Sequence, residues 1–123
     1  MSDELGKPRD LFWRTRQLGV RIVRMYAALP KSTESQIIGK QVLRSGTSVG
    51  AQYREGKRAR STAEFISKLE SALQELEETG YWLDLLVDCE IVTEKKLAAL
   101  RQEIEELIAI MVTSVRTAKK RRT

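Results

Sequence analysis

Histidine is absent from the sequence, and cysteine occurs once, at Cys89. The missing imidazole removes the most common general base of enzymes and the most common ligand of transition metals. A single cysteine excludes an internal disulfide, and without histidine it also excludes a structural zinc site. The composition therefore predicts no metal site and no cofactor, and we expect a protein that is not an enzyme.

Long apolar stretches are also missing, because no segment approaches the roughly 18 residues that a membrane span requires. Residues 1–10 are polar and acidic rather than basic and then apolar, so we expect no signal peptide. Hydrophobic residues make up 41% of the chain and charged residues 32%, as in globular proteins. We expect a single domain over residues 1–123, located in the cytoplasm and without a membrane partner.

Acidic residues are scarce in the first half of the chain and abundant in the second. Residues 1–60 hold 13 Lys and Arg against 5 Asp and Glu, for a net charge of +8. Residues 61–118 hold 5 against 12, for a net charge of −7, and residues 119–122 add +4. This separation of charge favours an anionic partner, association between unlike faces of two copies, or both.

Strand and hairpin patterns are missing, and apolar residues instead recur every three or four positions. The recurrence predicts four helices and a basic tail, over residues of about 10–29, 34–58, 61–90, 93–119 and 119–123. Pro30 ends the first helix because a proline ring disfavours helical geometry in the residue before it. Since the connections are short, consecutive helices are expected to run antiparallel, and we predict an all-α, up-down-up-down four-helix bundle.

The apolar positions also predict which side chains form the core. In the first helix, Arg14 and Arg16 fall outside the apolar stripe. In the third helix, Ser61 and Glu64 fit a capping box. The predicted stripe of that helix consists of Phe65, Ile66, Leu69, Leu73, Leu76, Gly80, Leu83 and Val87. From Tyr81 onward the apolar face widens to include Trp82, which indicates either a subunit interface or a thicker end of the core.

The second helix holds many small residues, in the segment GKQVLRSGTSVGAQYREGKRAR over residues 39–60. Gly39, Gly46 and Gly50 allow another backbone to approach closely, and we predict that they serve helix packing or an interface. A glycine inside a helix costs about 1 kcal/mol relative to alanine. Tertiary packing must offset this cost, or the segment breaks into two helices near residues 45–48.

A longer stretch carries a family resemblance: IGKQVLRSGTSVGAQYREGKRARSTAEFISKLESALQELEETGYWLDLL at residues 38–86. Together with the LP pair at residues 29–30, it closely resembles the bacterial four helix bundle proteins. These are related to the proteins encoded in intervening sequences of large-subunit ribosomal RNA genes. The resemblance covers about residues 11–115.

The resemblance implies a left-handed four-helix bundle that assembles as a homopentamer around a central channel. A more distant relative is the accessory protein of diversity-generating retroelements, a basic pentameric barrel that binds nucleic acid and a reverse transcriptase. The resemblance therefore implies that the partners of this chain include other copies of itself.

Cations cluster toward the end of the second helix and again near the end of the chain. We predict a surface that binds RNA or DNA, formed by Lys40, Arg44, Arg54, Lys57, Arg58, Arg60, Lys119, Lys120, Arg121 and Arg122. Binding of this kind is electrostatic and largely independent of base sequence.

Alternative roles for the same side chains stay open. The cations of the second helix can pair with acidic residues of the third helix or of a neighbouring subunit, which favours a scaffold for an unidentified protein partner. The acidic candidates are Glu70, Glu75, Glu77, Glu78, Asp84 and Asp88. The cations at 119–122 can serve the helix dipole and solubility instead.

Aromatic side chains are few, and they lie on or near the apolar stripes. They are Trp13, Tyr53, Tyr81 and Trp82. We expect them in the core or in an interface rather than stacked on nucleic-acid bases.

Overall fold

The structure, a computed structural model, describes residues 10–122 and contains four helices. They are α1 (Leu11–Ala27), α2 (Thr33–Lys57), α3 (Thr62–Asp88) and α4 (Glu94–Arg122). No strand occurs within this range, so the predicted all-α class and the four-helix bundle are confirmed. None of these helices is apolar over a length that would cross a bilayer.

Side-chain caps begin the helices at the positions that the sequence indicates. The Asp10 carboxylate accepts a hydrogen bond from the Phe12 amide at 2.9 Å, and the Ser61 hydroxyl accepts one from the Glu64 amide at 3.1 Å. The Glu64 carboxylate reaches back to the amide of Arg60, at 3.3 Å. Each such cap stabilises its helix by about 1 kcal/mol.

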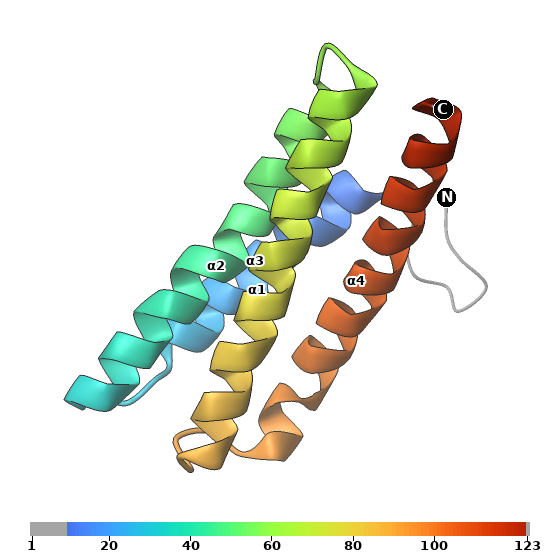
Figure 1. The fold of residues 1–123 in the computed structure, drawn as a ribbon. Helices are drawn as coiled ribbons and strands as arrows, with labels where there is room; N and C mark the ends of the chain where they lie inside the picture. The colour runs from blue at the N-terminus through green and yellow to red at the C-terminus, as the bar shows by residue number, and fades with distance from the viewer. Residues whose placement is uncertain (1–9, 123) are drawn as a thin grey trace.

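The helices lie side by side, with two of the three connections at one end of the bundle and the α2–α3 connection at the other (Figure 1). α2 packs against both α1 and α3, and α3 also packs against α4. Among the helix pairs that touch, α1 and α4 contact each other least. α2 is continuous through residues 45–48, so the alternative of a break at this point is not realised.

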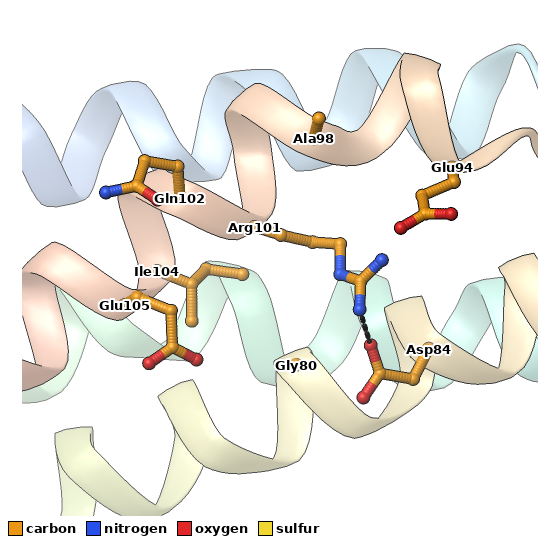
Figure 2. Close-up of a pocket in the computed structure, with 8 residues that line it drawn as sticks. All are labelled: Gly80, Asp84, Glu94, Ala98, Arg101, Gln102, Ile104 and Glu105. Atoms are coloured by element: carbon orange, nitrogen blue, oxygen red, sulfur yellow. Dashed lines mark ion pairs between the residues drawn. The ribbon is translucent and has the colours of Figure 1, made fainter.

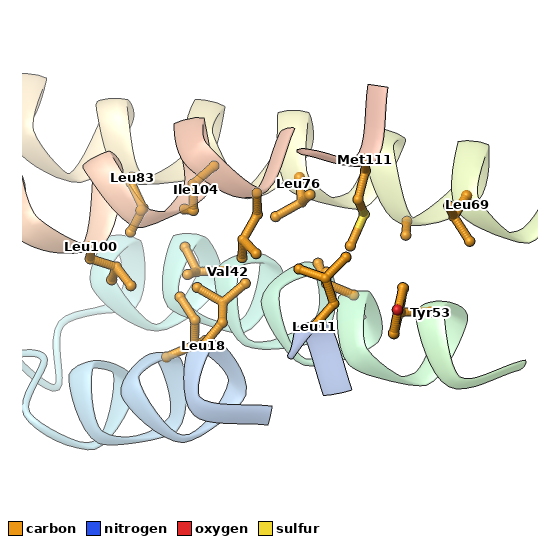
Figure 3. Close-up of a cluster of buried hydrophobic side chains, with 14 of the residues drawn as sticks. Leu11, Leu18, Val42, Tyr53, Leu69, Leu76, Leu83, Leu100, Ile104 and Met111 are labelled. Carbon is orange, nitrogen blue, oxygen red and sulfur yellow. The ribbon is translucent and has the colours of Figure 1, made fainter. Parts of the chain in front are cut away.

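The core forms where side chains from all four helices meet, as the labelled leucines, Val42, Ile104 and Met111 show in Figure 3. On α3 the buried stripe differs from the predicted one, because Ala72 and Thr79 are buried where Leu73 and Gly80 were expected. The Thr79 hydroxyl donates to the Glu75 carbonyl oxygen and lies 2.8 Å from the Ser45 hydroxyl oxygen. These contacts satisfy the hydrogen-bonding capacity of Thr79, a polar residue that the hydrophobic pattern alone would place at the surface.

Glycines on α2 allow α1 to approach closely. A Cβ atom at Gly46 would lie 2.7 Å from Cγ1 of Ile22, and one at Gly39 would lie 2.6 Å from Cδ1 of Leu29. Real side chains do not come this near, so both positions require glycine for the observed packing. The packing of α1 on α2 offsets the helix-forming penalty of these residues.

Arg14 is buried, which corrects the prediction that it lies outside the apolar stripe of the first helix. Its side chain is 2% exposed, and its guanidinium contacts Glu103 at 2.6 and 2.9 Å and Glu106 at 3.0 Å. The hydrogen bonds that Arg14 donates to Glu103 raise the pKa of its guanidinium above the ordinary value, so the group stays charged. This cluster joins α1 to α4, the two helices that otherwise make little contact.

The end of the chain also differs from the prediction. α4 continues to Arg122, so residues 119–122 belong to its last turn instead of a tail beyond it. Alanine at position 118 is buried against the core and extends the packed face of α4 to this point. The positive charges therefore follow a helical arrangement.

Substitution of two helical glycines by alanine tests the close approach of α1 and α2. Gly46→Ala should lower the free energy of unfolding by about 1–2 kcal/mol, because the clash with Ile22 exceeds the gain in helix propensity. Gly80→Ala is the matched control and should raise it by about 0.5–1 kcal/mol, because nothing lies within 4 Å of the new Cβ. Urea titration measures both, and equal stabilisation by the two changes would contradict the packing.

Removal of Arg14 tests the link between α1 and α4. Arg14→Leu should lower the free energy of unfolding by about 2–4 kcal/mol, because two partly buried carboxylates lose their contacts with the guanidinium. Adding Glu103→Leu and Glu106→Leu should recover part of this stability, because the partly buried carboxylates that faced Arg14 are removed with it. Thermal and urea unfolding of both variants provides the measurement. An unchanged stability in Arg14→Leu would show that the ion cluster contributes nothing.

Candidate nucleic-acid interface

Arg44 is already occupied by acidic side chains of the neighbouring helix. Its guanidinium lies 3.5 Å from a carboxylate oxygen of Glu75 and pairs with Glu78. The Trp82 indole also donates to Glu78, at 3.2 Å. For Arg44, the alternative of pairing with the third helix is the one that the structure adopts.

Five other cations of the second helix and the turn after it make no ion pair within residues 10–122. We call them the unpaired cations: Lys40, Arg54, Lys57, Arg58 and Arg60. All five are exposed. Pairing with α3 was the alternative for these residues too, and it does not occur inside the chain. Their charge is available to a molecule outside it.

Two further acidic residues of α3 pair with basic residues of α4. Asp84 pairs with Arg101 at 2.6 Å, and Glu70 pairs with Lys119 at 3.2 Å. Because a carboxylate balances the charge of Lys119, this residue contributes less to the predicted binding surface than an unpaired cation does.

The other cations predicted at the end of the chain are Lys120, Arg121 and Arg122, which follow Lys119 on α4. Lys120 and Arg121 are exposed on the last turn of the helix. The side chain of Arg122 lies outside the described part of the chain. Arg121 lines a small depression together with Lys57 and Arg60, so the end of α4 approaches the end of α2.

A groove of about 640 Å³ runs between α1 and α2 and has a cationic lining. Arg16 of α1, Arg54 of α2 and Arg58, directly after α2, line it, and none of the lining residues is acidic. Its apolar and small lining residues are Phe12, Gly19, Val20, Gly50 and Ala51. Short side chains keep the groove open between two helices that pack closely elsewhere.

Two exposed aromatic side chains, Phe12 and Trp13, lie near the beginning of α1, so Trp13 does not belong to the core of the chain. Trp13 is 47% exposed and Phe12 37%. The Phe12 ring packs edge-on against the buried Tyr53 ring, with centroids 5.2 Å apart. Burial of Tyr53 raises the pKa of its phenol. The edge-on contact with Tyr53 therefore restrains the Phe12 ring, which remains partly exposed to solvent.

An acidic groove lies on the other side of the bundle, between α3 and α4 (Figure 2). Asp84, Glu94 and Glu105 line it, and the Arg101 side chain extends across it to Asp84. Near it, Tyr81 is 56% exposed, while Trp82 is half-buried. The two grooves have opposite charge. Within residues 10–122, no cluster of acidic or cysteine side chains is arranged to hold a metal ion.

The predicted packing glycines have their contacts inside the chain. Gly39 and Gly46 are buried against α1, so neither is accessible to a neighbouring subunit. Gly50 is half-buried and lines the cationic groove, and a Cβ there would lie 3.3 Å from the Thr15 hydroxyl oxygen.

Arg16 is the site residue that sequence reasoning missed. It was assigned only to the solvent side of the first helix, and the candidate surface was confined to the second helix and the end of the chain. Its place beside Arg54 and Arg58 depends on which face of α1 packs against α2. The glycines at 46 and 50 were the available signal, because they mark the face of α2 that α1 approaches.

Comparison with known proteins gives a family match. Residues 10–113 match the family model described as 23S rRNA-intervening sequence protein. A crystal structure of a protein from Bacteroides thetaiotaomicron VPI-5482, described as of unknown function and from the S23 ribosomal protein family, is 36% identical in sequence. It superposes with a TM-score of 0.80 over 85% of this chain and 96% of that one. No curated protein matches the chain.

Proposed function

Because the chain belongs to the 23S rRNA-intervening sequence protein family, we propose that it is a non-enzymatic, oligomeric bundle protein that binds nucleic acid electrostatically in the cytoplasm. One observation carries the proposal. The unpaired cations and Arg16 are exposed and lack acidic partners among residues 10–122, while other cations of the same molecule are paired. Phosphate groups are the partners that such a cluster attracts most strongly.

The proposed contact does not read base sequence. Arginine and lysine contacts to phosphate position a nucleic acid without sequence information. The paired Arg44 and Lys119 contribute less, because their charge is already balanced by carboxylates. The binding surface thus centres on the end of α2 and on the α1–α2 groove.

We propose an antiparallel, up-down-up-down bundle as the scaffold of this surface. Arg44 pairs with Glu78 and Glu55 pairs with Lys68, so residue numbers rise along α2 as they fall along α3. The ion pairs between α3 and α4 follow the same order. The left-handed sense is an implication of the family resemblance.

We propose that copies of the chain assemble into a ring, which the resemblance implies is a homopentamer. The separation of charge between residues 1–60, at +8, and residues 61–118, at −7, supports contacts between unlike faces. The same feature favours a second candidate function, in which the unpaired cations serve subunit or protein contacts and the protein is a scaffold. The two functions make different predictions for charge reversal.

Reversal of the charges at Arg54, Lys57 and Arg58 to glutamate should weaken nucleic-acid binding about 100-fold or more. It should also reduce the dependence of log affinity on log salt concentration by about 2–3. The matched control reverses Lys31, Lys95 and Lys96, which are exposed, lie at the other end of the bundle and give the same net charge. This control should bind nearly as the wild type does.

Fluorescence anisotropy with labelled RNA and DNA at about 50 and 200 mM salt measures the affinity, and light scattering after gel filtration measures the assembly. Loss of binding with an intact oligomer supports the proposed function. Dissociation of the oligomer assigns the cations to subunit contacts and favours the scaffold. Absence of wild-type binding at the lower salt concentration would refute nucleic-acid binding.

A further inference from the structure

We propose that the α1–α2 groove binds unpaired nucleotides of a single strand, with bases stacked on Phe12 and Trp13 and phosphates held by Arg16, Arg54 and Arg58. This inference rests on the proposed function and adds the class of nucleic acid to it. It is carried by the position of exposed aromatic rings beside cations that have no partner within the described chain.

The spacing of residues on α1 places Arg16 next to two aromatic side chains. Phe12 and Arg16 are four residues apart, and Trp13 and Arg16 are three apart, so Arg16 neighbours both rings on the helix surface. Phe12 and Arg16 both line the groove, and Trp13 is on the adjoining solvent side. One cation thus lies between two aromatic platforms.

The rings of Phe12 and Trp13 are both exposed to solvent. Most large apolar side chains of the described chain are buried, and the core is filled without Trp13. Trp13 and Phe12 therefore leave a large part of their surface in water, where stacking on a base would remove it. Tyr53 restrains Phe12 by its edge-on contact, which reduces the side-chain entropy that stacking would otherwise cost.

The α1–α2 groove combines apolar surface with positive charge. An apolar surface alone would suit a protein helix equally well. This one contains three arginines and no carboxylate, so an occupant must bring negative charge as well as flat apolar surface. Successive nucleotides of a single strand provide both, in the form of phosphates and unstacked bases.

The accessibility of the bases separates a single strand from a duplex. The bases of a duplex remain stacked on each other and are not accessible to Phe12 or Trp13, whereas those of a single strand can unstack. A duplex would contact the exposed cations only through its outer phosphates.

Three probes of equal length, about 15 nucleotides, test the inference by anisotropy. They are an oligothymidylate, an abasic strand with the same number of phosphates, and a blunt duplex. If bases stack, oligothymidylate should bind about tenfold or more tightly than the abasic strand. Equal affinity of these two strands would overturn the inference, because it would show that phosphates alone are recognised.

Substitution of the aromatic platforms provides the second readout. Phe12→Leu with Trp13→Leu should abolish the preference for oligothymidylate over the abasic strand and leave the abasic strand and the duplex bound as before. Tyr81→Leu is the matched control, because it removes another exposed aromatic ring, which follows Gly80 of the acidic groove on α3. Tyr81→Leu should keep the preference. A preference that survives in the double variant would overturn the inference.

Fluorescence supplies a test in which both platforms remain intact. The chain has two tryptophans, so Trp82→Phe leaves Trp13 as the only one. Oligothymidylate should quench its emission, and the abasic strand should quench it much less, because base stacking on an indole is what changes. Equal emission with both strands bound would contradict stacking at Trp13.

Failure of the inference and failure of the proposed function give different results. If the abasic strand, the duplex and oligothymidylate all bind with similar affinity, the protein binds nucleic acid and only the stacking role is wrong. If none of the three binds at about 50 mM salt, both proposals are wrong. The groove is then assigned to a protein partner or a second copy.

Discussion

The close approach of α1 to α2 is the constraint on which the candidate site depends. It requires residues without side chains at Gly39 and Gly46, where a Cβ would lie within 3 Å of side-chain atoms of α1. At this separation, Arg16 of α1 lines the same groove as Arg54 and Arg58. A larger residue at position 46 would push the helices apart and separate these cations. The glycines thus act on function through helix spacing.

The charge of the molecule is organised by the same packing. The acids of α3 are matched by Arg44 and by basic residues of α4, and the buried Arg14 takes two carboxylates of α4. The unpaired cations take no part in these pairs. The modest net charge of +5 therefore leaves a strongly cationic surface on one side and an acidic groove on the other. An anion meets a local charge much higher than the average over the molecule.

Much of the fold follows from local rules. Helical periodicity, Pro30 and the capping box at Ser61 were sufficient to predict four helices in the correct order. The errors arose where a side chain interacts across helices. Arg14 is buried because Glu103 and Glu106 lie opposite it, and Thr79 is buried because its hydroxyl has hydrogen-bonding partners in the Glu75 carbonyl oxygen and the Ser45 hydroxyl. Periodicity within one helix contains no information about such partners.

The candidate site could be predicted only in part, for the same reason. The cations of the second helix were evident from composition, but which of them are paired depends on the register of α2 against α3 and α4. Arg44 lies opposite two glutamates, while Arg54 and Arg58 lie beside α1. The role proposed for Phe12 and Arg16 depends on which side of α1 packs against α2. The sequence of α1 alone does not identify the helix that covers that side. The sequence therefore predicts the helices, but it does not predict which helices pair or in which register they pack.

Hydrogen–deuterium exchange of the wild-type protein, with and without saturating oligothymidylate at low salt, tests the central claim most directly. The account predicts slower exchange in peptides that cover residues 11–20 and 47–60, and unchanged exchange along the acidic groove at residues 80–84 and 94–105. Protection centred on the acidic groove, or no change anywhere in the presence of bound strand, would contradict it.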